Sequence, residues 1–378
     1  MGDTTTTKPQ AEPTSNFPTK APFERERLIV ELAVQRVRIL AEKVLSFVDK
    51  GELSKADASP VSLADFGAQA LLVSAIHTEF PNDLIIGEEN ADALRADSKL
   101  MKKVWDLVNS TRLADEESEK LLGRPKSMEE MCKMIDLGGQ TNDSARGRVW
   151  VIDPIDGTKT FLAGTQYAIV VALMVDGVDQ LGIIGCPKMD WHAGLVSEDA
   201  IATQGLGWTV TGVRGHGNYA RPMSTGSLLP ATPVSKRPAR TTYQDAIFLD
   251  SMMSEKSRFP NRNDFAEKLG AKLPAMNIYS SSMTYVALAL NIGQFRVRAP
   301  LPSAPASFIW DHAGGICIVE EAGCKVTDLR GTAIDLTLGR RLAANWGNVI
   351  ADESMHDQIL TVVKDSFQTF PEFEKALG

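Results

Sequence analysis

The stretch WVIDPIDGTKTF, residues 150–161, constrains the fold of this chain more than any other segment. The apolar residues 150–152 are typical of a buried strand, and Asp153 and Asp156 follow on either side of Pro-Ile. Two carboxylates this close together repel each other, and burying either one without a partner is costly. The fold must therefore bring a positive charge, from a side chain or a metal ion, to the end of this strand.

Composition limits the classes of function. The chain has 378 residues, of which 43% are hydrophobic and 23% charged, so it can form a large core and two domains. Its formal net charge of -8 argues against a nucleic-acid or membrane-surface binder, because such proteins carry clustered Lys and Arg. A small phosphorylated ligand is compatible with this charge if a metal or a local basic patch holds it.

The targeting and cysteine patterns indicate a cytoplasmic protein. No apolar run approaches the roughly 20 residues that span a bilayer. Residues 1–21 are polar and rich in Pro and Thr, so we expect a disordered tail. Cys132, Cys186, Cys317 and Cys324 form no CxxC pair, which is typical of reduced structural thiols in the cytosol. We also expect a monomer, since no exposed apolar helix is predicted.

Hydrophobic periodicity in the first half predicts helices and then strands. One amphipathic helix is expected over 23–50, and a second from Ser62 to about Phe80, with Asp65 completing a capping box. Strand-like segments follow, two of them joined by a tight VDGVDQ hairpin turn. They cover residues 83–87, 148–153, 167–177 and 180–187, with a further hairpin within 205–240. We expect an N-terminal α+β domain over 22–225.

Strands and helices alternate in the second half, a pattern typical of an α/β domain. Strands are expected at 245–250, 277–279, 295–300, 324–329 and 348–352, with helices at 261–270, 281–292, 310–322 and the C-terminus. We expect this C-terminal domain to span 226–378.

Acidic residues stand at the ends of several predicted elements. Glu88 follows one strand, Asp153 and Asp156 follow another, Asp311 precedes a helix, and Asp57 lies in a loop. Taken singly, Asp311 fits a helix N-cap, Asp57 a solvated loop acid, and Glu88 an ion pair with any basic residue. Taken together, a cluster built from carboxylates suits Mg²⁺. Two such ions about 4 Å apart can hold a phosphate and activate a water molecule.

The residues that follow Asp156 suit a phosphate. Gly157 allows close approach of the backbone, and a short helix after it would present N-terminal amides to an anion. The Thr158 hydroxyl is placed to orient an attacking water. The sequence therefore predicts a metal-dependent phosphatase.

Three motifs carry a family resemblance. GEE at 87–89, DPIDGT at 153–158 and WDHAGG at 310–315 resemble the signatures of the lithium-sensitive, Mg²⁺-dependent phosphatases of the inositol monophosphatase superfamily, in the same order and spacing. The resemblance extends over residues 23–355. It implies the five-layered αβαβα sandwich of the inositol monophosphatase and fructose-1,6-bisphosphatase type, with the active site between two domains.

The resemblance also implies roles for individual residues. Asp57 and Thr158 would activate the water for in-line attack, and Gly157 and Thr158 would hold the phosphate. Two or three Mg²⁺ ions would be held by Glu88, Asp153, the Ile155 carbonyl, Asp156 and Asp311.

Within the superfamily, the chain most resembles the 3′(2′),5′-bisphosphate nucleotidases, which remove the 3′-phosphate of adenosine 3′,5′-bisphosphate (PAP) in sulfur and nucleotide metabolism. The segments at 56–69 and 175–187, and the helical insert before 147, carry this resemblance. PAP or its sulfated form PAPS is then the expected substrate, with Ser281 and Arg298 as nucleotide contacts.

Departures from the group's pattern lie on the substrate side. This chain has Thr284 where the group usually has Lys, and Met253 near its usual His. Thr160 and Ala163 replace a Gly and an Arg. An inositol phosphate, a sugar phosphate or a nucleotide of a specialised pathway therefore remains an alternative substrate. A catalytically inactive nucleotide-binding regulator is the second alternative.

Overall fold

The structure is a computed structural model that describes residues 21–49, 60–139, 146–251 and 262–377. Two predicted site residues, Asp57 and Met253, lie outside the described residues, and so does the predicted tail apart from Ala21.

A seven-stranded sheet forms the centre of the first half. Its order is β1-β2-β3-β4-β5-β6-β7, with β1 parallel to β2 and antiparallel pairing elsewhere. The predicted β3–β4 hairpin is confirmed, and Asp176 and Gly177 at its turn have φ of 51° and 81°. The strands are β1 Leu84–Gly87, β2 Arg148–Asp156, β3 Ala168–Val175, β4 Val178–Cys186, β5 Trp208–Val213, β6 Gly217–Pro222 and β7 Thr232–Val234.

A five-stranded mixed sheet forms the centre of the second half, in the order β11-β12-β10-β8-β9. Its strands are β8 Ile247–Asp250, β9 Lys272–Asn277, β10 Phe295–Arg298, β11 Cys324–Thr327 and β12 Asn348–Asp352. The chain passes from the first sheet to the second between β7 and β8, so the predicted division at residue 225 falls before the last strand of the first sheet. The division into two domains itself stays a prediction.

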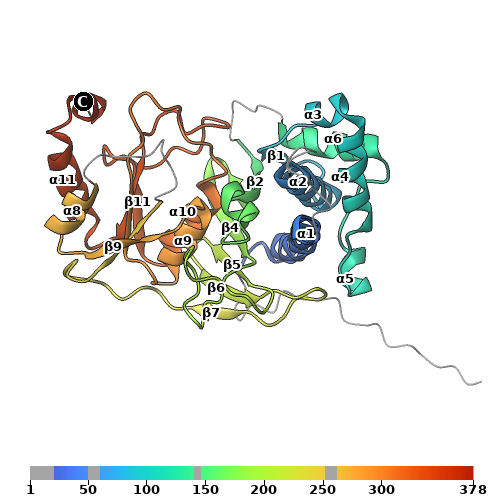
Figure 1. Cartoon of the computed structure of the whole chain (residues 1–378), viewed down its shortest axis with the longest axis horizontal. Coiled ribbons are helices and arrows are strands. Elements are labelled where there is room, and N and C mark those ends of the chain that lie inside the picture. The colour runs from blue at the N-terminus through green and yellow to red at the C-terminus, as the bar shows by residue number, and fades with distance from the viewer. Residues whose placement is uncertain (1–20, 50–59, 140–145, 252–261, 378) are drawn as a thin grey trace, which may run out of the picture.

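Helices and sheets alternate in five layers (Figure 1). Helices α1 (Glu24–Asp49) and α2 (Pro60–Glu79) cover the outer face of the first sheet. Helices α9 (Ser281–Ala289) and α10 (Ala313–Glu321) lie between the two sheets. The outer face of the second sheet carries α8 Arg262–Lys268, α11 His356–Phe367 and α12 Pro371–Leu377. The predicted αβαβα sandwich is confirmed.

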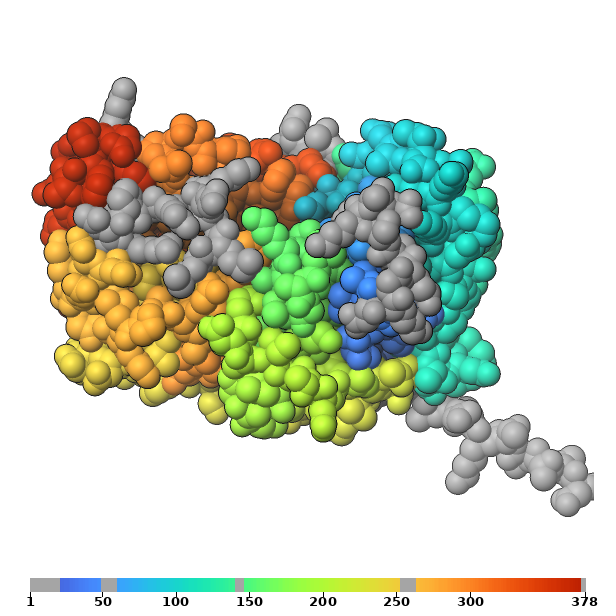
Figure 2. Space-filling model, in the orientation of Figure 1, coloured from blue at the N-terminus to red at the C-terminus, as the bar shows by residue number. Residues whose placement is uncertain are grey.

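The described part of the predicted insert forms four helices. They are α3 Asp92–Ala96, α4 Ser98–Ser110, α5 Glu116–Lys120 and α6 Met128–Gly139, of which α4 and α6 pack on α2. In the space-filling view this helical end, the first sheet and the second sheet form one continuous body (Figure 2). Among the described helices, none is long and apolar enough to cross a membrane.

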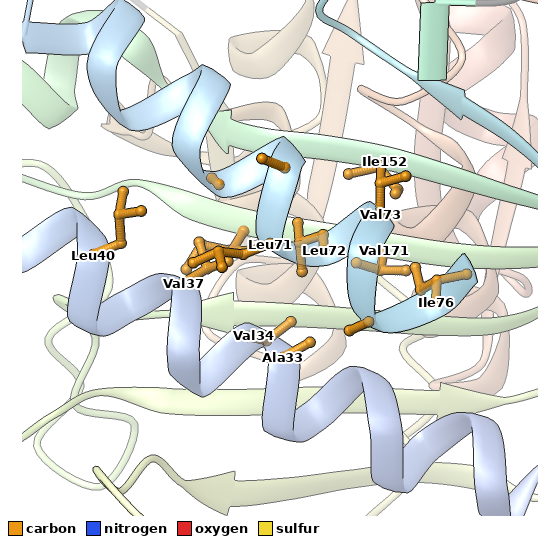
Figure 3. Close-up of a cluster of buried hydrophobic side chains, with 14 of the residues drawn as sticks. Ala33, Val34, Val37, Leu40, Leu71, Leu72, Val73, Ile76, Ile152 and Val171 are labelled. Atoms are coloured by element: carbon orange, nitrogen blue, oxygen red, sulfur yellow. The ribbon is translucent and has the colours of Figure 1, made fainter. Parts of the chain in front are cut away.

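The side-chain period of strand β2 divides the core. Trp150 and Ile152 pack toward α1 and α2, while Val149 and Val151 pack toward the central helices, because successive side chains point to opposite faces. Figure 3 shows the contacts of the sheet with α1 and α2. It includes Ala33, Val34, Val37, Leu40, Leu71, Leu72, Val73, Ile76, Ile152 and Val171. Buried on both faces, β2 carries its terminal acids into the interior.

One predicted helix start is wrong. Helix α2 begins at Pro60 in the described chain, so Ser62 lies inside the first turn and cannot cap it with Asp65. Proline suits this first turn, where a backbone N–H is not needed. Asp65 is instead buried in the second turn, with 6% of its surface exposed.

Candidate active site

A bulge at the end of β2 aims its two acids. Asp153 pairs with Val170 of β3 and Asp156 with Ala168, so the ladder shifts register between them. Pro154, which lacks a backbone donor, occupies this irregular step. Asp153 and Asp156 remain 2% and 8% exposed. The local turn therefore holds two buried carboxylates beside each other.

Two further acids come from neighbouring elements. Glu88 follows β1, whose Gly87 pairs in parallel with Ile152 of β2, so both strands deliver an acid to the same sheet edge. Asp311 lies two residues before α10 and is not its N-cap, since His312 holds that position. One carboxylate oxygen each of Asp153, Asp156 and Asp311 lie within 4.8 Å of one another.

These acids line a cavity of about 220 Å³ between the two sheets. Nine of the twelve predicted site residues line it, and the strand ends and helix starts of both halves contribute to its walls. Its lining comprises Glu88, Asp153, Ile155, Asp156, Gly157, Thr158, Leu249, Asp250, Ser251, Tyr279, Ser281, Arg296, Val297, Arg298 and Asp311.

The acids raise one another's pKa values. Burial, and then the charges of Glu89, Asp311 and Asp156, raise the pKa of Glu88 to about 8. Burial and Asp156 raise the pKa of Asp311 to about 6. The pKa of Asp153 lies well above its usual value for the same reasons. Several of these carboxyl groups therefore hold their protons more tightly than usual. A divalent cation bound among them would neutralise their negative charges.

The charges of Arg298 and Arg296 act to lower the pKa of Asp311, but no described side chain forms an ion pair with these acids. Glu88, Asp153, Asp156 and Asp311 form no ion pair with any described Lys or Arg. Lys159, the basic residue nearest in sequence, is exposed and has its Nζ 5.8 Å from the Tyr279 ring centre.

The donor set fits Mg²⁺. Asp153 Oδ1 is buried with no hydrogen-bond partner, so it is an orphaned oxygen at the cluster. Asp156 Oδ2 accepts from the Ser280 hydroxyl at 2.8 Å and the Ser282 amide at 2.6 Å, which fixes this carboxylate. The described lining of the cavity contains no Cys or His, and oxygen-only sites favour hard cations.

Gly157 connects the acids to a short helix. Its φ is 94°, and an added Cβ would lie 2.8 Å from Thr160 Oγ1. Thr158, exposed at the start of α7 (Thr158–Leu162), lines the cavity. The Thr160 hydroxyl donates to the Gly157 carbonyl at 2.8 Å, so this departure from the family pattern locks the turn.

Two of the predicted substrate contacts differ in placement. Arg298 lines the cavity, where its Nη1 donates to Ser307 Oγ at 3.1 Å and to His312 Nε2 at 3.3 Å. Thr284 does not line it, because this side chain is buried on α9 and donates to the Ser280 carbonyl at 3.0 Å.

His312 is packed inside the protein rather than solvated. Its Nδ1 lies 2.7 Å from the Tyr285 hydroxyl, and its Nε2 accepts from Arg298, which can only donate. The ring is thus the neutral Nδ1–H tautomer. Burial, followed by the charges of Arg298 and Arg296, lowers its pKa well below the usual value. His312 therefore serves as a fixed acceptor that orients Arg298.

Sequence reasoning missed two residues. Arg296 lines the cavity beside Arg298, and the two-residue spacing on one strand is the signal that would have revealed it. Asp65 has a buried Oδ1 with no hydrogen-bond partner, and burial and the charges of Glu88 and Glu89 raise its pKa well above the usual value. The sequence signal that would have revealed Asp65 is an acidic residue within an otherwise apolar helix.

Comparison with known proteins identifies the family of this chain. The model of the inositol monophosphatase family matches residues 26–367. A 3′(2′),5′-bisphosphate nucleotidase of Emericella nidulans is 39% identical over 90% of this chain and 98% of its own length. One of Schizosaccharomyces pombe is 34% identical over 93% and 99%. The staphylococcal SaIMPase-II with 2′AMP bound has the same fold, with a TM-score of 0.55 at 16% identity, over 91% of this chain and 94% of that one. The chain belongs to the inositol monophosphatase family.

Proposed function

We propose that this protein is a Mg²⁺-dependent 3′(2′),5′-bisphosphate nucleotidase that removes the 3′-phosphate of PAP or PAPS. The observation that carries the proposal is the cluster of acids at this cavity that form no ion pair with a described Lys or Arg, in a chain whose relatives carry this name. The ligand is a small phosphorylated nucleotide. The cytoplasmic location and the monomeric state stay predictions from the sequence.

Two or three Mg²⁺ ions would be held by the carboxylates of Glu88, Asp153, Asp156 and Asp311 and the Ile155 carbonyl. Bound there, they supply charge neutralisation at the phosphate and a lowered pKa for the attacking water. The chain's part is to hold these oxygens in place. Ser280 and Ser282 do so for Asp156, and the β2–β3 ladder does so for Asp153.

Proton transfer falls to Thr158 and a nearby acid. Asp57, predicted for this role, lies outside the described residues and stays a prediction. Asp65 is the described candidate: α2 contacts α7, which begins at Thr158, and Asp65 has an unpaired buried oxygen and a raised pKa. A carboxylate at this position can accept the proton of the attacking water through the Thr158 hydroxyl.

The test is phosphate release from PAP, inositol 1-phosphate and a sugar bisphosphate, each with Mg²⁺ and with EDTA. Fast release from PAP that EDTA abolishes is the expected result. Release mainly from one of the other substrates would replace the nucleotide by that substrate class. Mg²⁺ binding without any turnover would favour the inactive regulator.

A further inference from the structure

Arg296 is a buried cation that forms no ion pair with a described acid, although the charges of Asp156 and Asp311 act to raise its pKa. It lies on β10 with 6% of its surface exposed, lines the cavity, and its Nη1 is buried with no hydrogen-bond partner. Its described contacts are a 3.5 Å hydrogen bond from Nη2 to Ser281 Oγ and the Tyr285 ring at 5.8 Å. Leaving a guanidinium in this state costs several kcal/mol unless an anion joins it.

Three other buried arginines in the described chain each form an ion pair with a carboxylate. Arg36 pairs with Glu119 at 3.2 Å, Arg221 with Glu31 at 3.1 Å, and Arg237 with Asp352 at 3.2 Å. Arg296, in contrast, forms no ion pair with a described carboxylate.

A second cation stands beside Arg296. Arg298 points to the same face of β10, and its described partners are Ser307 and His312, both neutral. Burial, together with the charge of Arg298, lowers the pKa of Arg296. Neither guanidinium forms an ion pair with a described acid, so an anion bound between them would supply a close partner for both, and their fork geometry suits phosphate.

Ser281 connects the Arg296–Arg298 pair with Thr284, one of the positions where this chain departs from the family pattern. Ser281 and Thr284 are three residues apart on α9, and Thr284 stands where the family resemblance places a lysine. Thr284 turns its hydroxyl to the backbone and offers no charge. Arg296 reaches the same helix from the strand, at Ser281.

We propose that Arg296, with Arg298 and Ser281, binds the non-reacting phosphate of a substrate that carries two phosphates. Arg296 thereby supplies from β10 the cation that is missing at position 284, and it makes the enzyme selective for bisphosphates over monophosphates. This inference rests on the proposed function, since it assigns the second phosphate of that substrate.

The test compares two substrates that differ by one phosphate, PAP and adenosine 3′-monophosphate. Arg296→Gln should lower kcat/KM for PAP on the order of 100-fold, because a buried charge pair is lost, and leave the monophosphate within about threefold. Arg296→Lys should fall between wild type and Arg296→Gln. Arg341→Gln is the matched control, an exposed arginine stacked on Phe308 outside the cavity lining. Equal losses on both substrates, or no loss on either, would overturn the assignment.

A second readout separates this inference from the proposed function. In EDTA, without turnover, inorganic sulfate should raise the Tm of wild type and of Arg341→Gln but not of Arg296→Gln. Without sulfate, Arg296→Gln should be at least as stable as wild type, whereas a structural arginine would lower Tm when removed. If no substrate is hydrolysed but the sulfate shift depends on Arg296, the nucleotidase proposal fails and the anion site stands. If sulfate still raises the Tm of Arg296→Gln, the anion site is refuted. If Arg296→Gln does not fold, the same Tm measurement is made on Arg296→Lys.

Discussion

Buried charges are arranged differently in two regions of this molecule. Where α1 meets the first sheet, Glu31 pairs with Arg221 and accepts from Thr211 Oγ1 at 2.7 Å. At the cavity, Asp153 and Arg296 are also buried, yet neither forms an ion pair with a described residue of opposite charge. The first arrangement is complete within the chain and stabilises the fold. The second is incomplete and gains its partners from ligands.

The largest expected effect is on catalysis. Asp153→Asn should lower kcat with PAP on the order of 10³-fold, because loss of a metal ligand removes several kcal/mol of charge stabilisation. The metal-free variant should keep the wild-type Tm or exceed it, since one of several repelling carboxylates is gone. Phosphate release and thermal unfolding in EDTA measure the two effects. Near-normal activity in a folded variant would refute the metal assignment.

The opposite pattern is expected at the paired site. Glu31→Gln should lower the free energy of unfolding by about 3 kcal/mol, because Arg221 loses its buried carboxylate. Its kcat/KM at a temperature where it is folded should stay near wild type. Urea unfolding and steady-state kinetics make the comparison with Asp153→Asn. A variant that loses activity but not stability would erase the distinction between the regions.

A pH effect follows from the raised pKa values. Glu88 has a pKa of about 8 in the folded protein against an ordinary value of 4.5, so the folded state holds this proton more tightly. The contribution of Glu88 to the free energy of unfolding is fully present below pH 4.5. It is lost as pH rises toward 8, by up to about 1.4 kcal/mol per pH unit for each proton. In EDTA, Tm should therefore fall from pH 5 to pH 8.

Mg²⁺ provides the control for this slope. Saturating Mg²⁺ holds the site carboxylates deprotonated and should remove most of the decline, and Glu88→Gln should reduce it in EDTA. Asp179, whose pKa burial raises to about 7 beside Arg214, lies outside the cavity lining and leaves a residual slope in both conditions. Equal slopes with and without Mg²⁺ would contradict the account.

The smallest effect is expected at His312. His312→Phe removes the acceptor for Arg298 and the partner of Tyr285, so Arg298 loses orientation without losing charge. We expect KM for PAP to rise about threefold to tenfold with little change in kcat. A fall in kcat with unchanged KM would instead indicate that His312 supports the neighbouring Asp311 rather than Arg298.

The sequence predicted those parts of the site that local patterns determine. The strand that ends in Asp153 and Asp156 follows from a run of apolar residues, and the β3–β4 turn at 176–177 follows from turn residues. Glu88 and Asp153 converge because β1 and β2 are parallel neighbours, whereas the sequence predicted only that acids at the ends of elements form one cluster.

The missed features depend on contacts between distant elements. Ser62 and Asp65 fit a capping box by spacing, but tertiary packing lets α2 begin earlier and buries Asp65 near Glu88. Thr284 was expected in the pocket from its position, whereas its hydroxyl turns to its own helix. Arg296 belongs to no motif, and its role emerges only from its place in the cavity lining and from a buried Nη1 with no hydrogen-bond partner.

The most direct test of the account is a calorimetric titration of Mg²⁺ into wild type and Asp153→Asn at pH 7.5, in buffers of different ionisation enthalpy. The account predicts that wild type binds Mg²⁺ and releases protons, because Glu88, with a pKa of about 8, must lose its proton to bind metal. Asp153→Asn should bind far more weakly. Mg²⁺ binding of equal strength in both proteins, or binding without proton release, would contradict the claim that these unpaired acids form the metal site.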